Sequence, residues 1–419
     1  MKIFEPKIIS SLKGYTGKQL LSDVVAGIIV AIIALPLSIA LAIASGAKPE
    51  RGLYTAVVAG FVIALLGGSK VNISGPTAAF ATIVAGIIGA EGKGFEGLVI
   101  ATITAGLILI LMGVFRVGTF IKYVPKSITV GFTAGIAVTI LIGQLKDFTG
   151  ADYSNPVETL EKVAVFFENI KTVNPLAILV GVISLAILIG WNYVTKKVPG
   201  SIIVVVLGIL LVGITGVSVN TIGDLYTITP GFPKFSFPNI TGELFIKMLP
   251  DAFTIAILAG IESLLSCVVS DGMIGDTHNP NTELIAQGVG NVCSGLFGGI
   301  PATGAIARTA ANVKSGGRSP ISGIVHALVL LLVLVVLMPY ASFIPMPVIA
   351  SILFIVAYNM SEWRSFVKII KTKNVFDIIV LVLTFLLTVI FDLVVAIAVG
   401  LALHYAIVII KKLASKKAE

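Results

Sequence analysis

Apolar runs long enough to cross a lipid bilayer recur along this sequence, and they constrain its fold more than any other feature. A helix needs about 20 apolar residues to cross the hydrocarbon core, because each residue rises about 1.5 Å. Only 12% of the 419 residues are charged, and the mean hydropathy is +1.06. A soluble domain carries roughly twice that charge. The sequence therefore predicts an all-α polytopic membrane protein.

Fourteen transmembrane segments are expected, of which two are too short to cross alone. Full spans are predicted at 22–44, 52–67, 94–114, 126–146, 174–195, 200–216, 248–270, 282–298, 319–338, 345–360, 374–390 and 391–411, and the short segments lie at 76–90 and 303–314.

Lysine and arginine residues gather at both ends of the chain and in alternate loops, whereas the loop at 147–171 is acidic. The positive-inside rule places the basic side in the cytoplasm, so we expect both termini to be cytoplasmic. The net charge of +8 then reflects membrane topology rather than nucleic-acid binding.

The short segments follow two similar broken stretches. Residues 60–82 read "GFVIALLGGSKVNISGPTAAFAT" and residues 290–310 read "GNVCSGLFGGIPATGAIARTA". Both run from an apolar helix through Gly-Gly and a Ser/Thr-Gly pair into a short Ala- and Thr-rich helix. The chain is therefore predicted to be a 7+7 inverted repeat, since an odd number of spans inserts the two copies in opposite orientations.

Broken backbone at membrane depth is tolerated only where it is buried or lines a wet cavity. The two half-helices, with short extended leads, would point their N-termini at the midplane, where free N–H groups and the helix dipole favour an anion. The alternative is a pair of kinked helices that pack through small residues.

Two charged residues lie within predicted spans. Arg308 falls in the second half-helix, where it would pair with a substrate anion or form an internal salt bridge. Glu262 lies eleven residues after Asp251, about 16 Å into its span. Burial there favours a protonated carboxyl unless Arg308 keeps it ionised. Proton-coupled anion entry and a fixed partner for Arg308 are the two readings of Glu262.

Other reactive residues predict neither an enzyme nor a metal site. Cys267 and Cys293 lie in apolar surroundings, and the histidines at 278, 326 and 404 are far apart without an evident nucleophile. Asp271, Asp276 and His278 do not share a helix face suited to a metal ion. We expect no cofactor and no metal.

The chain resembles the SulP family of anion permeases, which is related to the solute carrier 26 proteins. The resemblance covers nearly the whole length. It rests on "DVVAGIIVAIIALPLSIALAIASGAKPERGLYTAVVAGFVIALLGG", "ISGPTAA", "GIESLLSCVVSDGMIGDTHNPNTELIAQGVGN" and "TGAIARTAANVKSGGRSPISGI". It implies the uracil-permease-like fold, with a substrate-holding core domain, a gate domain that mediates homodimer contacts, and elevator-type alternating access.

The expected organisation combines the repeats with these domains. It comprises a cytoplasmic segment at 1–19, a first repeat at 20–216 (core spans 1–4, gate spans 5–7), an extracytoplasmic linker at 217–247, a second repeat at 248–412 (core spans 8–11, gate spans 12–14) and a cytoplasmic tail at 413–419. Most family members continue into a STAS domain, and we expect none here.

The resemblance also implies site residues by position. Substrate binding is expected at Ser74, Gly75, Thr77, Ala78, Ala79, Thr303, Gly304, Ala305, Ile306 and Arg308, and ion coupling at Glu262 and Ser266. Glu262 matches proton-coupled sulfate and dicarboxylate members, and Arg308 matches a basic position that the bicarbonate type lacks. Sodium-coupled members have Asp at 262 and a hydroxyl four residues on, so Ser266 leaves a sodium site open.

The leading prediction is a secondary active transporter of a small inorganic or organic anion in the plasma (inner) membrane of a prokaryote. It is expected to be proton-coupled, with sulfate or a C4-dicarboxylate as favoured substrate. The alternatives are a sodium-coupled bicarbonate symporter and an anion channel, exchanger or voltage-responsive motor. Nucleobase uptake is less well supported, because a neutral ring would not require Arg308.

Overall fold

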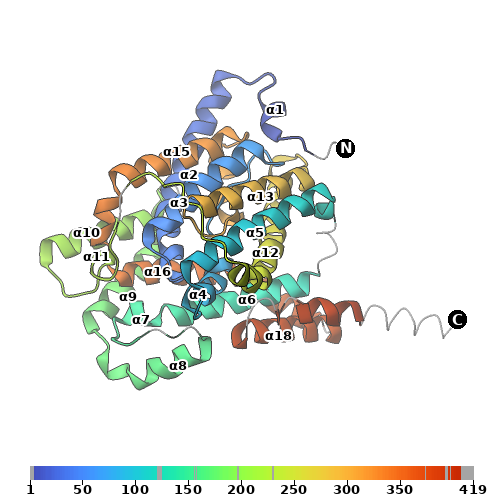
Figure 1. Ribbon diagram of the computed structural model, residues 1–419. Coiled ribbons are helices and arrows are strands. Elements are labelled where there is room, and N and C mark those ends of the chain that lie inside the picture. The colour runs from blue at the N-terminus through green and yellow to red at the C-terminus, as the bar shows by residue number, and fades with distance from the viewer. Residues whose placement is uncertain are drawn as a thin grey trace.

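The computed structural model describes residues 4–119, 125–154, 156, 158–195, 198–228, 231–372, 374–391, 395–396 and 398–406. These residues fold almost entirely into helices (Figure 1). In the part of the chain that is described, the only named strands are β1 (Ser74–Gly75) and β2 (Thr303–Gly304). The all-α prediction is therefore confirmed.

The helices before the predicted linker at 217–247 are α1 (Lys7–Ser11), α2 (Gly17–Ala44), α3 (Pro49–Leu66), η1 (Ala78–Phe80), α4 (Ala81–Gly89), α5 (Gly94–Val114), α6 (Lys126–Gly143), α7 (Leu145–Thr149), α8 (Thr159–Glu168), η3 (Ile170–Thr172), α9 (Pro175–Val194) and α10 (Gly200–Thr215). The later helices are α11 (Ile222–Leu225), α12 (Gly242–Ile274), α13 (Pro280–Leu296), α14 (Ile306–Lys314), α15 (Ile321–Val336), η4 (Met338–Phe343), α16 (Met346–Met360), α17 (Trp363–Lys371) and α18 (Val375–Ile390).

Six helical segments of the described chain are long and apolar enough to cross a membrane, namely Gly17–Ala44, Pro49–Leu66, Gly94–Val114, Lys126–Thr149, Gly242–Ile274 and Met346–Lys371. Shorter apolar helices occupy other predicted spans, including α10, α15 and α18. Of the expected span at 391–411, residues 395–396 and 398–406 are helical, whereas 392–394, 397 and 407–411, like the tail at 413–419, lie outside the described residues.

Local signals in the sequence explain where the longest helices start. Thr16 and Gln19 form a capping box at the start of α2, because each side chain accepts from the backbone N–H of the other. Thr241 caps α12 by accepting from Leu244 N at 3.3 Å. In α13, Asn279 caps the helix and Pro280 occupies its first turn.

The helices pack in two groups. In the first group α13 lies against α5 and α3, α12 against α5, and α15 against α2 and α3. In the second group α16 packs on α9 and α6, α18 on α6, and α10 on α9. Figure 1 shows the first group in the upper part of the molecule, with α6, α9, α16 and α18 below it.

The structure differs from the predicted boundaries at three places. The loop predicted at 147–171 contains α8, and the stretch after the span at 345–360 contains α17. Both helices are short, contain charged residues and have no buried residues, so neither forms a long apolar run in the sequence. Helix α12 begins at Gly242, inside the predicted linker, so Glu262 lies farther into its helix than the sequence count from Asp251 suggested.

Candidate functional site

The two broken stretches meet in the middle of the fold. Strands β1 and β2 pair antiparallel, with Ser74 opposite Gly304 and Gly75 opposite Thr303. Each strand leads directly towards a helix start, since η1 and α4 follow β1 and α14 follows β2. We call residues 67–77 lead one and residues 298–305 lead two.

Further bonds join lead one to the second half-helix. Ala305 N donates to Ile73 O at 2.9 Å, and Ile73 N donates to Thr309 Oγ1 at 3.0 Å. These bonds extend the contact between the leads beyond the four paired residues. The first amide groups of each helix have no partner within that helix. The two helix starts are thus held beside each other with backbone donors available.

Arg308 lies on α14 against lead one. Its side chain is 2% exposed and donates through Nη2 to the carbonyl oxygen of Pro76. Within the described residues its Nε and Nη1 have no hydrogen-bond partner. A buried guanidinium with free donors is costly unless an anion or water satisfies it. A Cβ on Gly75 would lie 2.6 Å from Arg308 Nη1, so a side chain there would displace the guanidinium.

Glu262 reaches lead one from α12. Its Oε2 accepts a hydrogen bond of 3.0 Å from Thr77 Oγ1, and its side chain is half-buried. No ion pair within 4.0 Å joins it to Arg308 in the described part of the chain. The two charged residues instead bind consecutive residues of lead one, Pro76 and Thr77.

The remaining predicted site residues are not all turned towards the helix starts. Ala78 and Ala79 are buried in η1, and Ile306 is 40% exposed at the start of α14. The hydroxyl of Thr303 donates to Ala259 O at 2.8 Å. Ser266 is fully buried, donates to Asn72 Oδ1 at 2.7 Å and lies 3.1 Å from Thr309 Oγ1. Both hydroxyls therefore already serve as donors within the protein.

The sequence analysis did not identify the buried carboxylate that bonds lead one. Glu283 on α13 is fully buried and bonds to lead one at Gly68 N and Asn72 Nδ2. Gln287, one turn later, donates to Ser74 Oγ at 2.8 Å. The available signal was a carboxylate and an amide four residues apart on one helix face, in an otherwise apolar segment.

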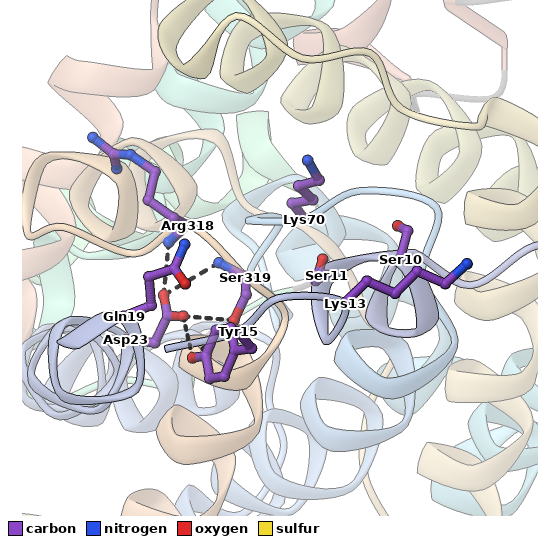
Figure 2. A pocket seen from close by; sticks show the side chains of 9 residues that line it. All are labelled: Ser10, Ser11, Lys13, Tyr15, Gln19, Asp23, Lys70, Arg318 and Ser319. Atoms are coloured by element: carbon purple, nitrogen blue, oxygen red, sulfur yellow. Dashed lines mark hydrogen bonds between the residues drawn. The ribbon is translucent and has the colours of Figure 1, made fainter. Parts of the chain in front are cut away.

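A separate hollow of about 190 Å³ lies near the N-terminal segment (Figure 2). Asp23 accepts there from Tyr15 Oη and Ser319 Oγ, both at 2.6 Å, and from Arg318 N at 2.7 Å. Burial, followed by the bond to Asp23, raises the pKa of Tyr15 to about 12. Lys13, Lys70 and Arg318 point apart in Figure 2, so this hollow does not concentrate positive charge on one ligand.

Among the described residues, no three His, Cys, Asp or Glu side chains form a group suited to a metal ion. His278 Nδ1 lies 2.6 Å from Asp271 Oδ2, which accounts for that pair without a metal.

Comparison with known proteins identifies the fold. The solved transmembrane domain of a cyanobacterial bicarbonate transporter, BicA, matches with a TM-score of 0.83 and 31% identity, covering 91% of this chain and 98% of that one. Murine Slc26a9, an anion transporter solved in the inward-facing state, matches in fold with a TM-score of 0.87 at 21% identity, covering 97% and 71%. The fold is that of an all-helical, multi-pass membrane transporter.

The sequence comparisons give the family. The profile of the sulfate permease family matches residues 20–384. The putative sulfate transporter YvdB of Bacillus subtilis (strain 168) is 45% identical over 402 residues, covering 94% of this chain and 74% of that protein. The bicarbonate transporter BicA of Picosynechococcus sp. is 33% identical over 393 residues, covering 91% and 69%. The chain belongs to the sulfate permease family of anion transporters and is not an enzyme.

Proposed function

We propose that this protein is a secondary active transporter that couples uptake of a small divalent anion, sulfate or a C4-dicarboxylate, to protons. The observation that carries the proposal is Arg308, a buried guanidinium whose Nε and Nη1 have no partner among the described residues, at the place where two helix starts meet. Substrate oxygens would accept from these N–H groups and from the amides at the starts of η1 and α14.

Coupling to protons follows from the position of Glu262. Its carboxylate accepts from one hydroxyl, Thr77 Oγ1, in the residue after the Pro76 carbonyl that accepts from Arg308. Protonation of Glu262 removes one negative charge beside the anion site, and this lowers the electrostatic cost of binding a divalent anion. The release of both on the other side of the membrane completes symport.

The transport cycle we propose is an elevator movement between two domains of a 7+7 inverted repeat. The antiparallel pairing of the two leads and the similar elements on either side of it support the repeat. The two groups of packed helices support a core domain around the leads and a gate domain of α6, α9, α10, α16 and α18, through which two copies would form a homodimer. Both termini would be cytoplasmic.

A sodium-coupled bicarbonate symporter is the second candidate, and the similarity to BicA favours it. In that reading Glu262 and Ser266 would bind sodium. Ser266, however, donates to Asn72 Oδ1, so its hydroxyl would have to turn towards the ion. Arg308 would then have no assigned role.

The test is uptake of labelled sulfate, succinate and bicarbonate into proteoliposomes under an inward proton gradient, an inward sodium gradient or neither. We expect proton-driven accumulation of one divalent anion. Sodium-driven accumulation of bicarbonate would establish the second candidate. Flux that neither saturates nor responds to either gradient would instead identify a channel.

A further inference from the structure

Glu283 is a buried carboxylate to which the proposed transport cycle assigns no task. It lies in the first turn of α13 and is 0% exposed. Its Oε2 accepts from Gly68 N at 2.9 Å, and its Oε1 accepts from Asn72 Nδ2 at 2.7 Å and Gln287 Nε2 at 3.0 Å. Three N–H donors therefore converge on one carboxylate, and two of them belong to lead one.

The Gly-Gly pair at the start of lead one allows this close approach. A Cβ on Gly67 would lie 3.2 Å from Glu283 Oε2. A Cβ on Gly68 would lie 2.1 Å from the carbonyl oxygen of Asn279 and 2.9 Å from Glu283 N. Side chains at 67 and 68 would thus separate lead one from the start of α13.

Two amide side chains connect Glu283 by hydrogen bonds to the residues around the proposed anion site. Gln287 donates to Glu283 and to Ser74 Oγ, and Ser74 belongs to β1. Asn72 donates to Glu283 while its Oδ1 accepts from Ser266 and from Thr309, at 2.7 and 3.0 Å. One carboxylate thereby connects lead one to α12, α13 and α14.

Lead two is held at its first residue by Arg51, whose Nη1 donates to Gly298 O at 2.7 Å, and farther along by neutral groups. Thr55 Oγ1 accepts from Ile300 N at 2.7 Å, and Ser294 Oγ donates to Ile300 O at 2.8 Å. Asn291 bonds both the N–H and the C=O of Ala302, each at 2.9 Å. Each lead therefore bonds one charged side chain at its Gly-Gly start, and at lead one this is a buried carboxylate on which three N–H donors converge.

We propose that Glu283 is a positioning residue for anion binding, a role that rests on the proposed function. Lead one bears Pro76 and Thr77, the two residues that contact Arg308 and Glu262. Charge-assisted hydrogen bonds are stronger than neutral ones. The carboxylate of Glu283 therefore holds lead one in place while Glu262 gains or loses its proton and the anion binds or leaves. With Glu283 in place, Arg308 and the helix starts keep the geometry that binds the anion.

The test compares Glu283→Gln with the intact protein in proteoliposomes, using whichever of labelled sulfate, succinate or bicarbonate the intact protein takes up fastest. An amide of similar size has only one acceptor oxygen, so the hydrogen bonds to the other oxygen are lost and the remaining ones are weakened. We expect the apparent substrate constant to rise about tenfold or more. The maximal rate per folded molecule should change far less, and the pH profile should not move.

Two further variants keep the test decisive. Gln287→Ala removes the link from Glu283 to Ser74 but leaves Glu283 bonded to Gly68 and Asn72, and it should raise the constant in the same direction by a smaller factor. Ser351→Ala removes an equally buried hydroxyl that bonds Gly181 O and Pro347 O among the gate helices. It should lower thermal stability and leave the substrate constant unchanged.

Unchanged substrate constants in both Glu283→Gln and Gln287→Ala would overturn the positioning role, as would a shift of the pH profile in Glu283→Gln. If Glu283→Gln does not fold, Gln287→Ala decides the question alone. A different result would overturn the proposed function: the intact protein would show no saturable uptake of any of the three anions.

Discussion

Thr77 Oγ1 donates a hydrogen bond of 3.0 Å to Oε2 of Glu262, so lead one contacts the carboxylate of α12 directly. The preceding residue, Pro76, accepts from Arg308 through its carbonyl oxygen. Two consecutive residues of one extended segment thus hold the carboxylate and the guanidinium that the sequence singled out. A change of charge on Glu262 therefore affects Thr77, the residue next to the one that Arg308 contacts.

Glu262→Gln should abolish the dependence of uptake on an inward proton gradient and leave exchange of anions across the membrane intact. The amide keeps the size of the side chain and accepts from Thr77, but it cannot exchange a proton. The measurement is uptake with and without the gradient, beside counterflow of the same anion. Glu96→Gln, at an exposed carboxylate bonded to Asn239 N, serves as the control. Proton dependence that survives in Glu262→Gln would exclude its role in coupling.

Much of this fold could be predicted from apolar length alone, because a bilayer requires spans of a known size. The extended leads were also predictable, since Ser74, Gly75 and Pro76 interrupt an apolar run and the twin stretch repeats the interruption. Helix α17 was not predictable, because its apolar and basic residues lie on opposite faces and form no long apolar run.

The site was predictable only in part. Arg308 and Glu262 stand out as charges within spans, but their bonds to Pro76 and Thr77 depend on tertiary packing of α12 and α14 against lead one. Glu283 was missed because it lies in the first turn of its helix, where a carboxylate is ordinary. Its burial by lead one is a long-range contact between residues more than two hundred positions apart.

Arg308→Ala should weaken binding of divalent anions more than that of monovalent anions, because the lost charge interacts with twice the charge on a divalent substrate. We expect the apparent constant for sulfate or succinate to rise by about two orders of magnitude, as a lost charged hydrogen bond is worth about 1.5–3 kcal/mol. Arg308→Lys should recover part of the loss, since an ammonium keeps the charge without the planar fork. Equal loss for both classes of anion would indicate damage to the fold instead.

Gly75→Ala should impair anion binding although it replaces no charged residue. The added Cβ would lie 2.6 Å from Arg308 Nη1, so the guanidinium has to move from the position in which it bonds Pro76. We expect the apparent substrate constant to rise about tenfold. Gly86→Ala is the matched control, because its Cβ would meet nothing within 4 Å on α4. An unchanged constant in Gly75→Ala would mean that the position of Arg308 does not govern binding.

Asp276 predicts a pH-dependent contribution of the N-terminal segment to stability. Lys7 and Lys70 lie 3.4 and 3.1 Å from its Oδ2. Burial alone raises the pKa of Asp276, but the hydrogen bonds from Thr277 N and Lys70 and the charges of Lys7 and Lys70 outweigh burial and lower it from its usual 3.8.

A carboxyl whose folded-state pKa is lowered contributes stability above its unfolded pKa and loses it as the pH falls through the folded value. Asp276→Asn should therefore lower the Tm by about 1–2 °C near pH 7, where the ion pairs are intact but partly exposed. The difference between Asp276→Asn and the intact protein should shrink as the pH falls below about 4, and about 1 M salt should reduce it at neutral pH. Thermal unfolding in detergent across this pH range measures the effect, and a Tm difference that stays constant down to the lowest pH would exclude ionic stabilisation by Lys7 and Lys70.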